Sequence, residues 1–304
     1  MEPIIQVKNL TKDYGQGRGI FDFSFEIEKG KVYGLVGTNG SGKTTTLRHL
    51  MGFLKPTAGS CSIMGLDCWN DAKEIKNHVG YVPGDINFPD VGNGDNFLKI
   101  QAQYLGLQDF SRVNQLINLF KLDTTAPLKR MSKGMKQKTA LIACFMKDAD
   151  IYLLDEPSTG LDPLMRDTLI DVILAEKAKG KTIFMSSHIF KELEDTCDAI
   201  IFIDRGKIIH RVDKSQHTAD IAKQYKVGFS NLDEFHQFLK KSQFKIVKIQ
   251  EQYQNCNLLC ETTKINQLFQ ELNQYKIKYF RNIPLTLEWY YTNIVNKEKE
   301  GGKL

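Results

Sequence analysis

The stretch GLVGTNGSGKTT, Gly34 to Thr45, decides the fold of this 304-residue chain. Within it, Gly37 to Thr44 fit the pattern GxxxxGK[ST] of a phosphate-binding loop. The apolar run KVYGLV that precedes the loop predicts a buried strand, and TTLRHLMGFL after it has the apolar spacing of a helix. Strand, glycine-rich loop and helix in this order indicate an α/β domain that binds a phosphorylated ligand. A glycine-rich turn with an incidental lysine is the less favoured alternative, because both flanking elements are present.

The loop residues supply the chemistry that a nucleotide's phosphates require. Glycines let successive backbone N–H groups turn inward and form a concave anion site, and the start of the following helix adds the positive end of its dipole. Lys43 is placed to reach the β- and γ-phosphates, and the Thr44 hydroxyl to bind Mg²⁺. The residues expected to hold the nucleotide are Gly37, Thr38, Asn39, Gly40, Ser41, Gly42, Lys43, Thr44 and Thr45.

A second motif, ADIYLLDEPSTGLDP, carries two adjacent acids at the end of an apolar run. Ile151 to Leu154 predict a buried strand that ends at Asp155 and Glu156. Ligands of open α/β sheets bind at the carboxyl ends of the strands, so we expect both carboxylates beside the phosphate loop. Adjacent side chains on an extended chain face opposite ways, which favours Asp155 as the Mg²⁺ partner and Glu156 as the general base. Solvated acids that merely end a strand are the alternative.

A third motif places a histidine at the same edge. The run TIFM predicts a strand that leads into Ser186, Ser187 and His188. A histidine at a strand end is more often structural, but an imidazole beside a γ-phosphate donates a hydrogen bond to developing charge. We therefore favour a functional role for His188.

Composition limits the classes of protein that fit. The chain is 41% hydrophobic and 25% charged, which is typical of globular proteins that bury a core. A formal charge of +5 favours acidic partners without indicating nucleic acid. The six cysteines have no CxxC spacing and no secretion signal is recognisable, so we expect reduced cytosolic thiols. The longest apolar runs fall short of the roughly 18 residues of a membrane span, so any crossing of a membrane requires another chain.

The motifs in this order, with MSKGMKQK between the first and second, resemble the ATP-binding cassette of ABC transporters over about residues 4 to 214. The resemblance implies a P-loop NTPase fold, with a RecA-like core and antiparallel β and helical subdomains, that binds ATP and Mg²⁺. It also implies that Ser132 and Gly134, in the family's signature loop, bind the γ-phosphate held by another subunit. The site is then shared in a homodimer or heterodimer.

The same resemblance gives roles to further residues. Asp162 matches the aspartate of the loop that crosses the dimer, and His188 matches the switch histidine. Tyr14, in LTKDYG, matches the aromatic residue that stacks on adenine.

Two positions depart from the family pattern. In VGYVPGDINFPD, Gly84 stands where the family has a glutamine that touches Mg²⁺. A glycine has no side chain to coordinate the metal, so we favour Asp85 as the replacement ligand, with an additional water or a simple turn as alternatives. Met135 stands where the signature has glutamine, and a thioether that cannot donate a hydrogen bond predicts packing at that position.

The composition changes at about residue 215, and we expect a cassette over residues 1–214 and an accessory domain over residues 215–304. The pattern βαββαβ predicts a ferredoxin-like α+β fold, in which Asn231 caps a helix together with Glu234. A final helix, LTLEWYYTNIV, resembles the closing segment of daunorubicin and bacitracin exporter ATPases, and residues 296–304 form a frayed tail. A dimer-stabilising or regulatory role is favoured over ligand sensing.

The resemblance implies the ATPase subunit of an ABC transporter, peripheral on the cytoplasmic face of the cell membrane. Its partner would be a separate transmembrane permease, with no nucleic acid, and export is favoured over import. The alternative is a soluble ABC-type ATPase that acts on ribosomes or DNA, but those proteins usually carry two cassettes or a coiled-coil insertion, which this sequence lacks. A nucleotide kinase would not explain the signature, Asp162 and His188 together. Neither the transported substrate nor the choice between homodimer and heterodimer follows from the sequence.

Overall fold

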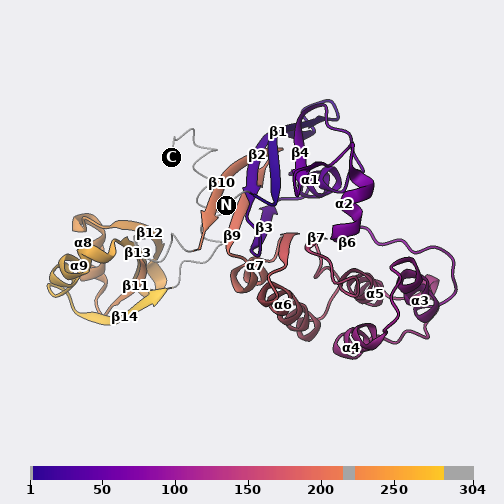
Figure 1. Ribbon diagram of the computed structural model, residues 1–304. Coiled ribbons are helices and arrows are strands. Elements are labelled where there is room, and N and C mark those ends of the chain that lie inside the picture. Colours follow the sequence, from indigo (N-terminus) through magenta and orange to yellow (C-terminus); the bar gives the residue numbers. More distant parts are fainter. Residues whose placement is uncertain (1–2, 215–222, 284–304) are drawn as a thin grey trace. The chain divides into compact units, whose positions relative to one another are not determined.

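The computed structural model of the protein describes residues 3–214 and 223–283 (Figure 1). The described chain divides after Asp213 into two compact units. Each unit has its own sheets and core, and each is described by itself.

A six-stranded sheet in the order β10-β9-β3-β8-β7-β6 forms the centre of the first unit. Its strands are β3 (Val32–Gly37), β6 (Val79–Val82), β7 (Ile151–Asp155), β8 (Thr182–Ser186), β9 (Ala199–Asp204) and β10 (Lys207–Asp213). All but β10 run parallel, and every residue of β3, β7 and β8 is buried, as expected for strands covered on both faces. The carboxyl ends of β3, β7 and β8 therefore meet at one edge.

A second, antiparallel sheet packs against this centre. It has the order β2-β1-β4-β5 and consists of β1 (Ile5–Asp13), β2 (Gly19–Ile27), β4 (Ala58–Ile63) and β5 (Leu66–Asp67). One apolar core joins the two sheets to α1 (Lys43–Leu50), and it includes Ile5, Phe23, Leu47, Leu50, Ile63, Leu153, Phe184 and Ile201. The turn between β1 and β2 carries Tyr14, whose N–H donates to the carbonyl of Arg18 at 2.9 Å.

The remaining helices of the first unit are α2 (Ala72–His78), α3 (Gly94–Tyr104), α4 (Ser111–Leu119), α5 (Lys133–Phe145), α6 (Pro163–Ala178) and α7 (Phe190–Thr196). Figure 1 shows α3 and α4 grouped beside α5, away from the β1–β2–β4 sheet. A parallel core with an antiparallel β part and a helical part confirms the predicted fold class.

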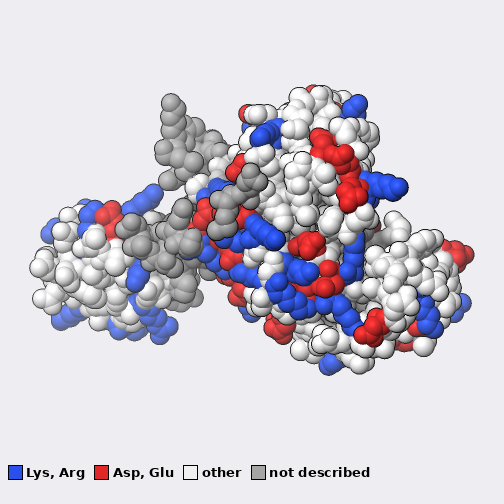
Figure 2. Space-filling view, in the orientation of Figure 1, with Lys and Arg blue, Asp and Glu red and all other residues white. Residues whose placement is uncertain are grey.

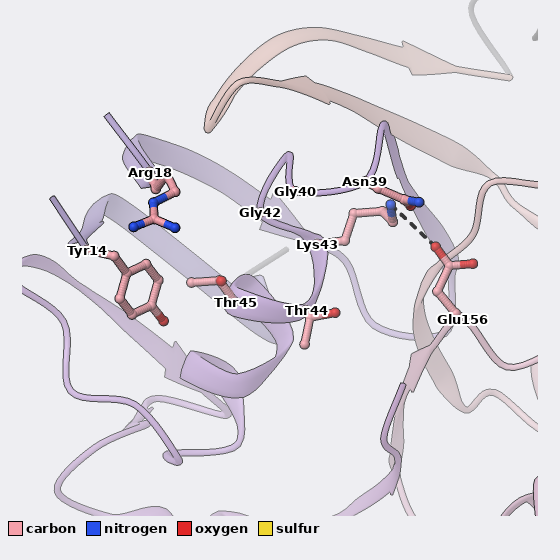
Figure 3. Close-up of a pocket in the computed structure, with 10 residues that line it drawn as sticks. Tyr14, Arg18, Asn39, Gly40, Gly42, Lys43, Thr44, Thr45 and Glu156 are labelled. Carbon is pink, nitrogen blue, oxygen red and sulfur yellow. Dashed lines mark ion pairs between the residues drawn. The ribbon is translucent and has the colours of Figure 1, made fainter. Parts of the chain in front are cut away.

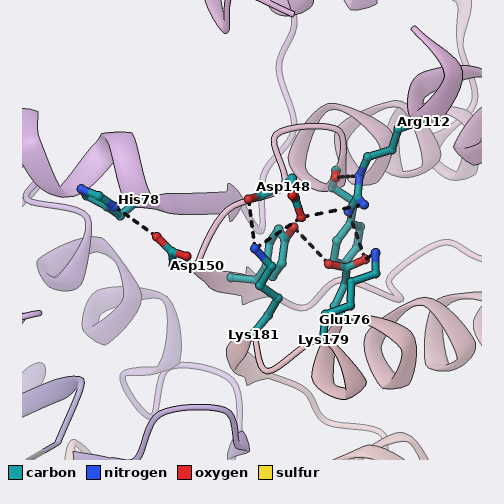
Figure 4. Close-up of polar contacts among 9 residues, drawn as sticks. His78, Arg112, Asp148, Asp150, Glu176, Lys179 and Lys181 are labelled. Atoms are coloured by element: carbon teal, nitrogen blue, oxygen red, sulfur yellow. Dashed lines mark hydrogen bonds and ion pairs between the residues drawn. The ribbon is translucent and has the colours of Figure 1, made fainter. Parts of the chain in front are cut away.

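Ion pairs join the helical part to the core near the amino end of β7 (Figure 4). Arg112 of α4 donates to the carbonyl of Phe145 at 2.7 Å and to Oε1 of Glu176 at 3.0 Å. The Glu176 side chain is buried and also accepts from Lys179 at 2.9 Å. A buried carboxylate needs such partners, so this cluster fixes α4 and α5 relative to α6.

Charged side chains are mixed on the surface of the first unit. On the face drawn in Figure 2, Lys and Arg side chains alternate with Asp and Glu.

In the part of the chain that the structure describes, no helix has the length and apolar character needed to cross a membrane.

The second unit has the expected order βαββαβ. Its elements are β11 (Lys223–Phe229), α8 (Leu232–Lys241), β12 (Lys245–Gln250), β13 (Asn255–Cys260), α9 (Ile265–Leu272) and β14 (Ile277–Ile283), and its antiparallel sheet has the order β12-β13-β11-β14. A separate aromatic core contains Phe229, Phe235 and Phe238.

The predicted cap of α8 is correct in one half. The Asn231 side chain accepts from the N–H of Asp233 at 2.8 Å. Glu234 instead accepts from the N–H of Lys276 at 2.6 Å, so it joins α8 to the approach to β14. The predicted final helix at 285–295, the TLEWYY segment and the tail at 296–304 lie outside the described residues.

We expect Phe229→Ala to destabilise the second unit by about 3–5 kcal/mol, because it removes a buried ring and leaves a cavity. Phe229 is 1% exposed, and its ring centroid lies 5.0 Å from that of Phe238. The measurement is denaturant unfolding of the full-length chain. Phe269→Ala is the matched control, because the Phe269 side chain is 50% exposed and its loss should cost about 1 kcal/mol or less. Equal losses in the two variants would contradict the proposed core.

Candidate nucleotide-binding site

A cavity of about 490 Å³ opens beside the glycine-rich loop (Figure 3). It is lined by Tyr14, Arg18, Gly19, Asn39, Gly40, Gly42, Lys43, Thr44, Thr45 and Glu156. Most of the predicted nucleotide-binding residues are therefore brought together, and the volume falls in the range of small-molecule sites. Arg18 and Gly19 were not predicted from the sequence.

Two glycines of the loop are required by close approaches. Gly42 has φ +115°, and an added Cβ there would lie 2.3 Å from Cγ2 of Ile20. At Gly37 an added Cβ would lie 2.4 Å from the carbonyl oxygen of Ile203. Ser41 is buried behind the loop and its hydroxyl has no hydrogen-bond partner in the structure. The loop therefore wraps tightly against β2 and β9 and presents its backbone to the cavity.

Lys43, at the first position of α1, donates hydrogen bonds to the backbone of the loop that precedes it. Its side chain is 7% exposed, and Nζ donates to the carbonyls of Gly37 at 2.8 Å and Thr38 at 3.3 Å. The same Nζ lies 3.3 Å from Oε1 of Glu156. A buried ammonium is thus compensated by two carbonyl dipoles and one carboxylate, at the place where an anion would enter.

Asp155 is fully buried at the end of β7. Its Oδ1 accepts from the hydroxyl of Ser186 at 2.7 Å, whereas Oδ2 is buried without a hydrogen-bond partner. An orphaned carboxylate oxygen fits a ligand of a hard divalent cation. Among the described residues no three His, Cys, Asp or Glu side chains are grouped to hold a metal.

Glu156 does not continue the strand, and the expected extended pair of acids is wrong in this detail. The backbone of Glu156 is left-handed, with φ +50°, so the chain turns immediately after Asp155. Its N–H donates to the carbonyl of Ser186 at 3.2 Å and to the Ser186 hydroxyl at 2.9 Å, which holds the turn. Such a conformation costs of order 1–3 kcal/mol in a non-glycine residue and is typical of functional sites.

His188 lies next to this turn. Its Nδ1 is 2.5 Å from Oε2 of Glu156, and its side chain is 58% exposed. Lys43, Glu156 and His188, which are far apart in sequence, therefore form one contiguous set. The two carboxylates are separated in environment, with Asp155 buried and Glu156 at the cavity wall.

The predicted signature and Asp162 do not line the cavity of their own chain. The Ser132 hydroxyl caps α5 by accepting from the N–H of Met135 at 3.2 Å, and Asp162 caps α6 by accepting from the N–H of Met165 at 3.0 Å. Both capping residues are exposed. An added Cβ at Gly134 would lie 2.7 Å from the carbonyl oxygen of Gly160, so the signature loop packs against the STGLD turn.

Gln137 makes a second link between these loops that the sequence analysis missed. It is buried in α5, and its Nε2 donates to the carbonyl of Pro157 at 2.8 Å. Polar residues of a helix usually face solvent, so the sequence did not indicate that Gln137 would be buried.

The segment after β6 lies against Asp155. An added Cβ at Gly84 would be 2.9 Å from Oδ2 of Asp155, whereas the Asp85 side chain is exposed. The replacement of the family's glutamine by Asp85 therefore stays a prediction.

Tyr14 is 50% exposed, and Nζ of Lys12 lies 5.9 Å from its ring.

Comparison with known proteins gives consistent matches. The model of the family described as "ABC transporter" matches residues 20–159. The Nod factor export ATP-binding protein I of Burkholderia lata is 33% identical over 251 residues, which cover 79% of this chain and 82% of that protein. The bacitracin transport ATP-binding protein BcrA of Bacillus licheniformis is 32% identical over 218 residues, which cover 70% of each chain. A solved structure of an ATP binding subunit of an ABC transporter superimposes with a TM-score of 0.65 at 28% identity, over 70% of this chain and 91% of that one.

We expect Gly84→Ala to raise the Mg²⁺ concentration needed for half-maximal ATP turnover about tenfold, because the added methyl group must displace the Asp155 carboxylate. The measurement is a Mg²⁺ titration of the ATPase rate. Binding of ATP without Mg²⁺ serves as the internal control and should stay unchanged. An unchanged Mg²⁺ requirement would show that Asp155 does not bind the metal or adjusts without cost.

Asp85→Ala separates the two explanations of the segment. If Asp85 is a metal ligand, the Mg²⁺ requirement rises as it does for Gly84→Ala. If GDINFPD is only a turn, the requirement stays at the wild-type value.

Proposed function

The chain belongs to the ABC transporter family, and on that premise we propose that it is the subunit that binds and hydrolyses ATP to drive a separate membrane-spanning chain. The observation that carries the proposal is that Lys43 and Glu156 line the cavity beside the phosphate loop and that His188 contacts Glu156. The orphaned oxygen of Asp155 lies at the end of the same strand.

In the proposed complex the Tyr14 ring stacks on the adenine, and the phosphates follow the loop from Asn39 to Thr45. Arg18 adds a positive charge to the outer part of the cavity that favours the anionic nucleotide. Aromatic stacking selects weakly among bases, so the phosphates supply most of the affinity.

The γ-phosphate competes with Glu156 for Lys43. In the structure the Lys43 ammonium is shared between loop carbonyls and Glu156, so a bound phosphate draws Nζ away and releases a carboxylate oxygen. Glu156 then accepts a proton from the attacking water while the oxygen–phosphorus bond forms and the bond to the β-phosphate oxygen breaks. His188 donates to the γ-phosphate oxygens as negative charge develops there.

Thr44 and Asp155 would hold the Mg²⁺ ion, which neutralises charge on the β- and γ-phosphates when it is bound. A hydroxyl and a carboxylate oxygen are the ligand types that Mg²⁺ prefers.

We extend the proposal to a site completed by a second ATP-binding subunit, identical or different. Its support is that Ser132, Gly134 and Asp162 are not among the residues that line the cavity of their own chain. The start of α5, with the positive end of its helix dipole and the exposed Ser132, would then bind the γ-phosphate of the partner's nucleotide.

The permease would dock in a groove of about 300 Å³ whose lining includes Tyr81, Pro83, Ile86, Phe88, Phe97 and Ala143, together with the polar Asn87, Gln101 and Lys147. The same segment presents Gly84 to Asp155, so movement at the metal site and in the groove would be linked.

The chain would lie on the cytoplasmic face of the membrane. Export is favoured because the relatives are named for Nod factor export and bacitracin transport. The same names make action on ribosomes or DNA the weaker candidate.

We expect Glu156→Gln to lower the ATP turnover rate about 10²–10⁴-fold while ATP binding is retained, because the amide cannot accept the proton. Turnover is measured by phosphate release and binding with a fluorescent nucleotide. Glu28→Gln, which removes an exposed carboxylate of the same unit, should leave both unchanged. Substantial turnover in Glu156→Gln would rule out the general-base role.

A shared site predicts that the specific ATPase rate falls on dilution, since monomers lack the signature of a partner. Ser132→Ala chains should also inhibit wild-type chains when the two are mixed. The rate is followed against total concentration and mixing ratio. A strictly linear dependence down to high dilution would exclude the shared site.

Copurification tests the partner. Tagged protein should retain a multi-span membrane chain after detergent extraction, and Phe88→Asp should release that chain while ATP binding persists, because a charge would be buried in the groove. Recovery of ribosomes or DNA in place of a membrane chain would favour the alternative function.

A further inference from the structure

Glu192, in the first turn of α7, contacts both loops that carry the proposed catalytic pair. Its Oε2 accepts from the hydroxyl of Ser158 at 2.8 Å and from that of Ser187 at 2.9 Å. Ser158 lies two residues after Glu156, and Ser187 immediately precedes His188. One carboxylate oxygen therefore joins the two loops.

Each of the two hydroxyls is part of a local turn. The Ser187 hydroxyl also accepts from the N–H of Ile189 at 3.0 Å, which closes a turn around His188. On the other loop, the carbonyl of Glu156 accepts from the N–H of Thr159 at 3.1 Å, which closes a turn that contains Ser158. Fixing the two hydroxyls therefore fixes the turns from which Glu156 and His188 project.

A carboxylate is a costly choice for this position. Glu192 is 3% exposed, and its Oε1 has no hydrogen-bond partner. Burial raises the pKa of Glu192, while the bonds from Ser158 and Ser187 and the charge of Arg166 oppose this rise and the nearby Glu156 adds to it. The start of α7 favours a negative charge, but this effect does not explain why two hydroxyls from different loops converge on one oxygen.

We propose that Glu192 is a positioning residue that sets the register between Glu156 and His188, so that a displacement of either loop is transmitted to the other. In this role the carboxylate acts through Ser158 and Ser187. The inference rests on the proposed function in one respect, namely that Glu156 and His188 act together on the γ-phosphate.

The test compares Glu192→Ala with Glu192→Gln. Alanine removes the shared acceptor, so kcat for ATP should fall about 10–100-fold while KM changes less than about threefold, since Lys43 and the phosphate loop lie on other elements. Glutamine offers one amide oxygen to both hydroxyls and should keep kcat within about threefold of wild type. The imidazole NMR signals of His188, assigned with His188→Ala, should shift in the alanine variant and stay in place in the glutamine variant.

A second set of variants keeps the test decisive if Glu192→Ala does not fold. Ser158→Ala and Ser187→Ala each remove one of the two hydrogen bonds and should each lower kcat, and their combination should cost less than the sum of the two free-energy losses. Fully additive losses, or wild-type kcat and His188 signals in the Glu192 and serine variants, would overturn the proposal.

The failure of the proposed function looks different. If Glu156 is not the base, Glu156→Gln itself retains turnover. If only the positioning role fails, Glu156→Gln is inactive while Glu192→Ala hydrolyses ATP normally.

Discussion

Parallel pairing of β3, β8 and β7 is the constraint on which the site depends. Ser186 pairs with Asp155 and with Leu35, so β7 and β8 end level with each other and β3 extends two residues further, to Gly37. The phosphate loop, the turn at Glu156 and the turn at His188 leave the sheet from these ends. A shift of one residue in either pairing would turn the side chains of that strand to the opposite face and separate the groups that now meet.

The parts of this arrangement that follow from sequence are those encoded by local pattern. Apolar runs of four to six residues predicted β3, β7 and β8, and the rule that ligands bind at the carboxyl ends of strands predicted Asp155, Glu156 and His188 beside the loop. The cap at Asn231 was predictable in the same way, from residue types a few positions apart. Local pattern did not reveal the left-handed turn at Glu156, because a residue before proline favours an extended backbone.

The remaining features depend on packing between distant segments. Gln137 contacts Pro157, 20 residues away, and Glu192 contacts Ser158, 34 residues away, so neither contact has a periodic signature. The approach of Gly84 to Asp155 depends likewise on how the segment after β6 crosses the end of β7. Arg18 lines the cavity only because the β1–β2 turn folds over the loop. For Ser132, Asp162 and Tyr14 the residues alone suggested nothing, and their proposed roles come from family resemblance.

The position of Lys43 has a consequence for how the nucleotide-free protein behaves. The Lys43 ammonium already contacts the carbonyls of Gly37 and Thr38 and the carboxylate of Glu156. Nucleotide binding therefore replaces some of these contacts with contacts to phosphate. The heat released on binding is then a difference between old and new contacts, smaller than the count of phosphate contacts suggests. The same contacts compensate the buried charge of Lys43 with groups of the protein itself.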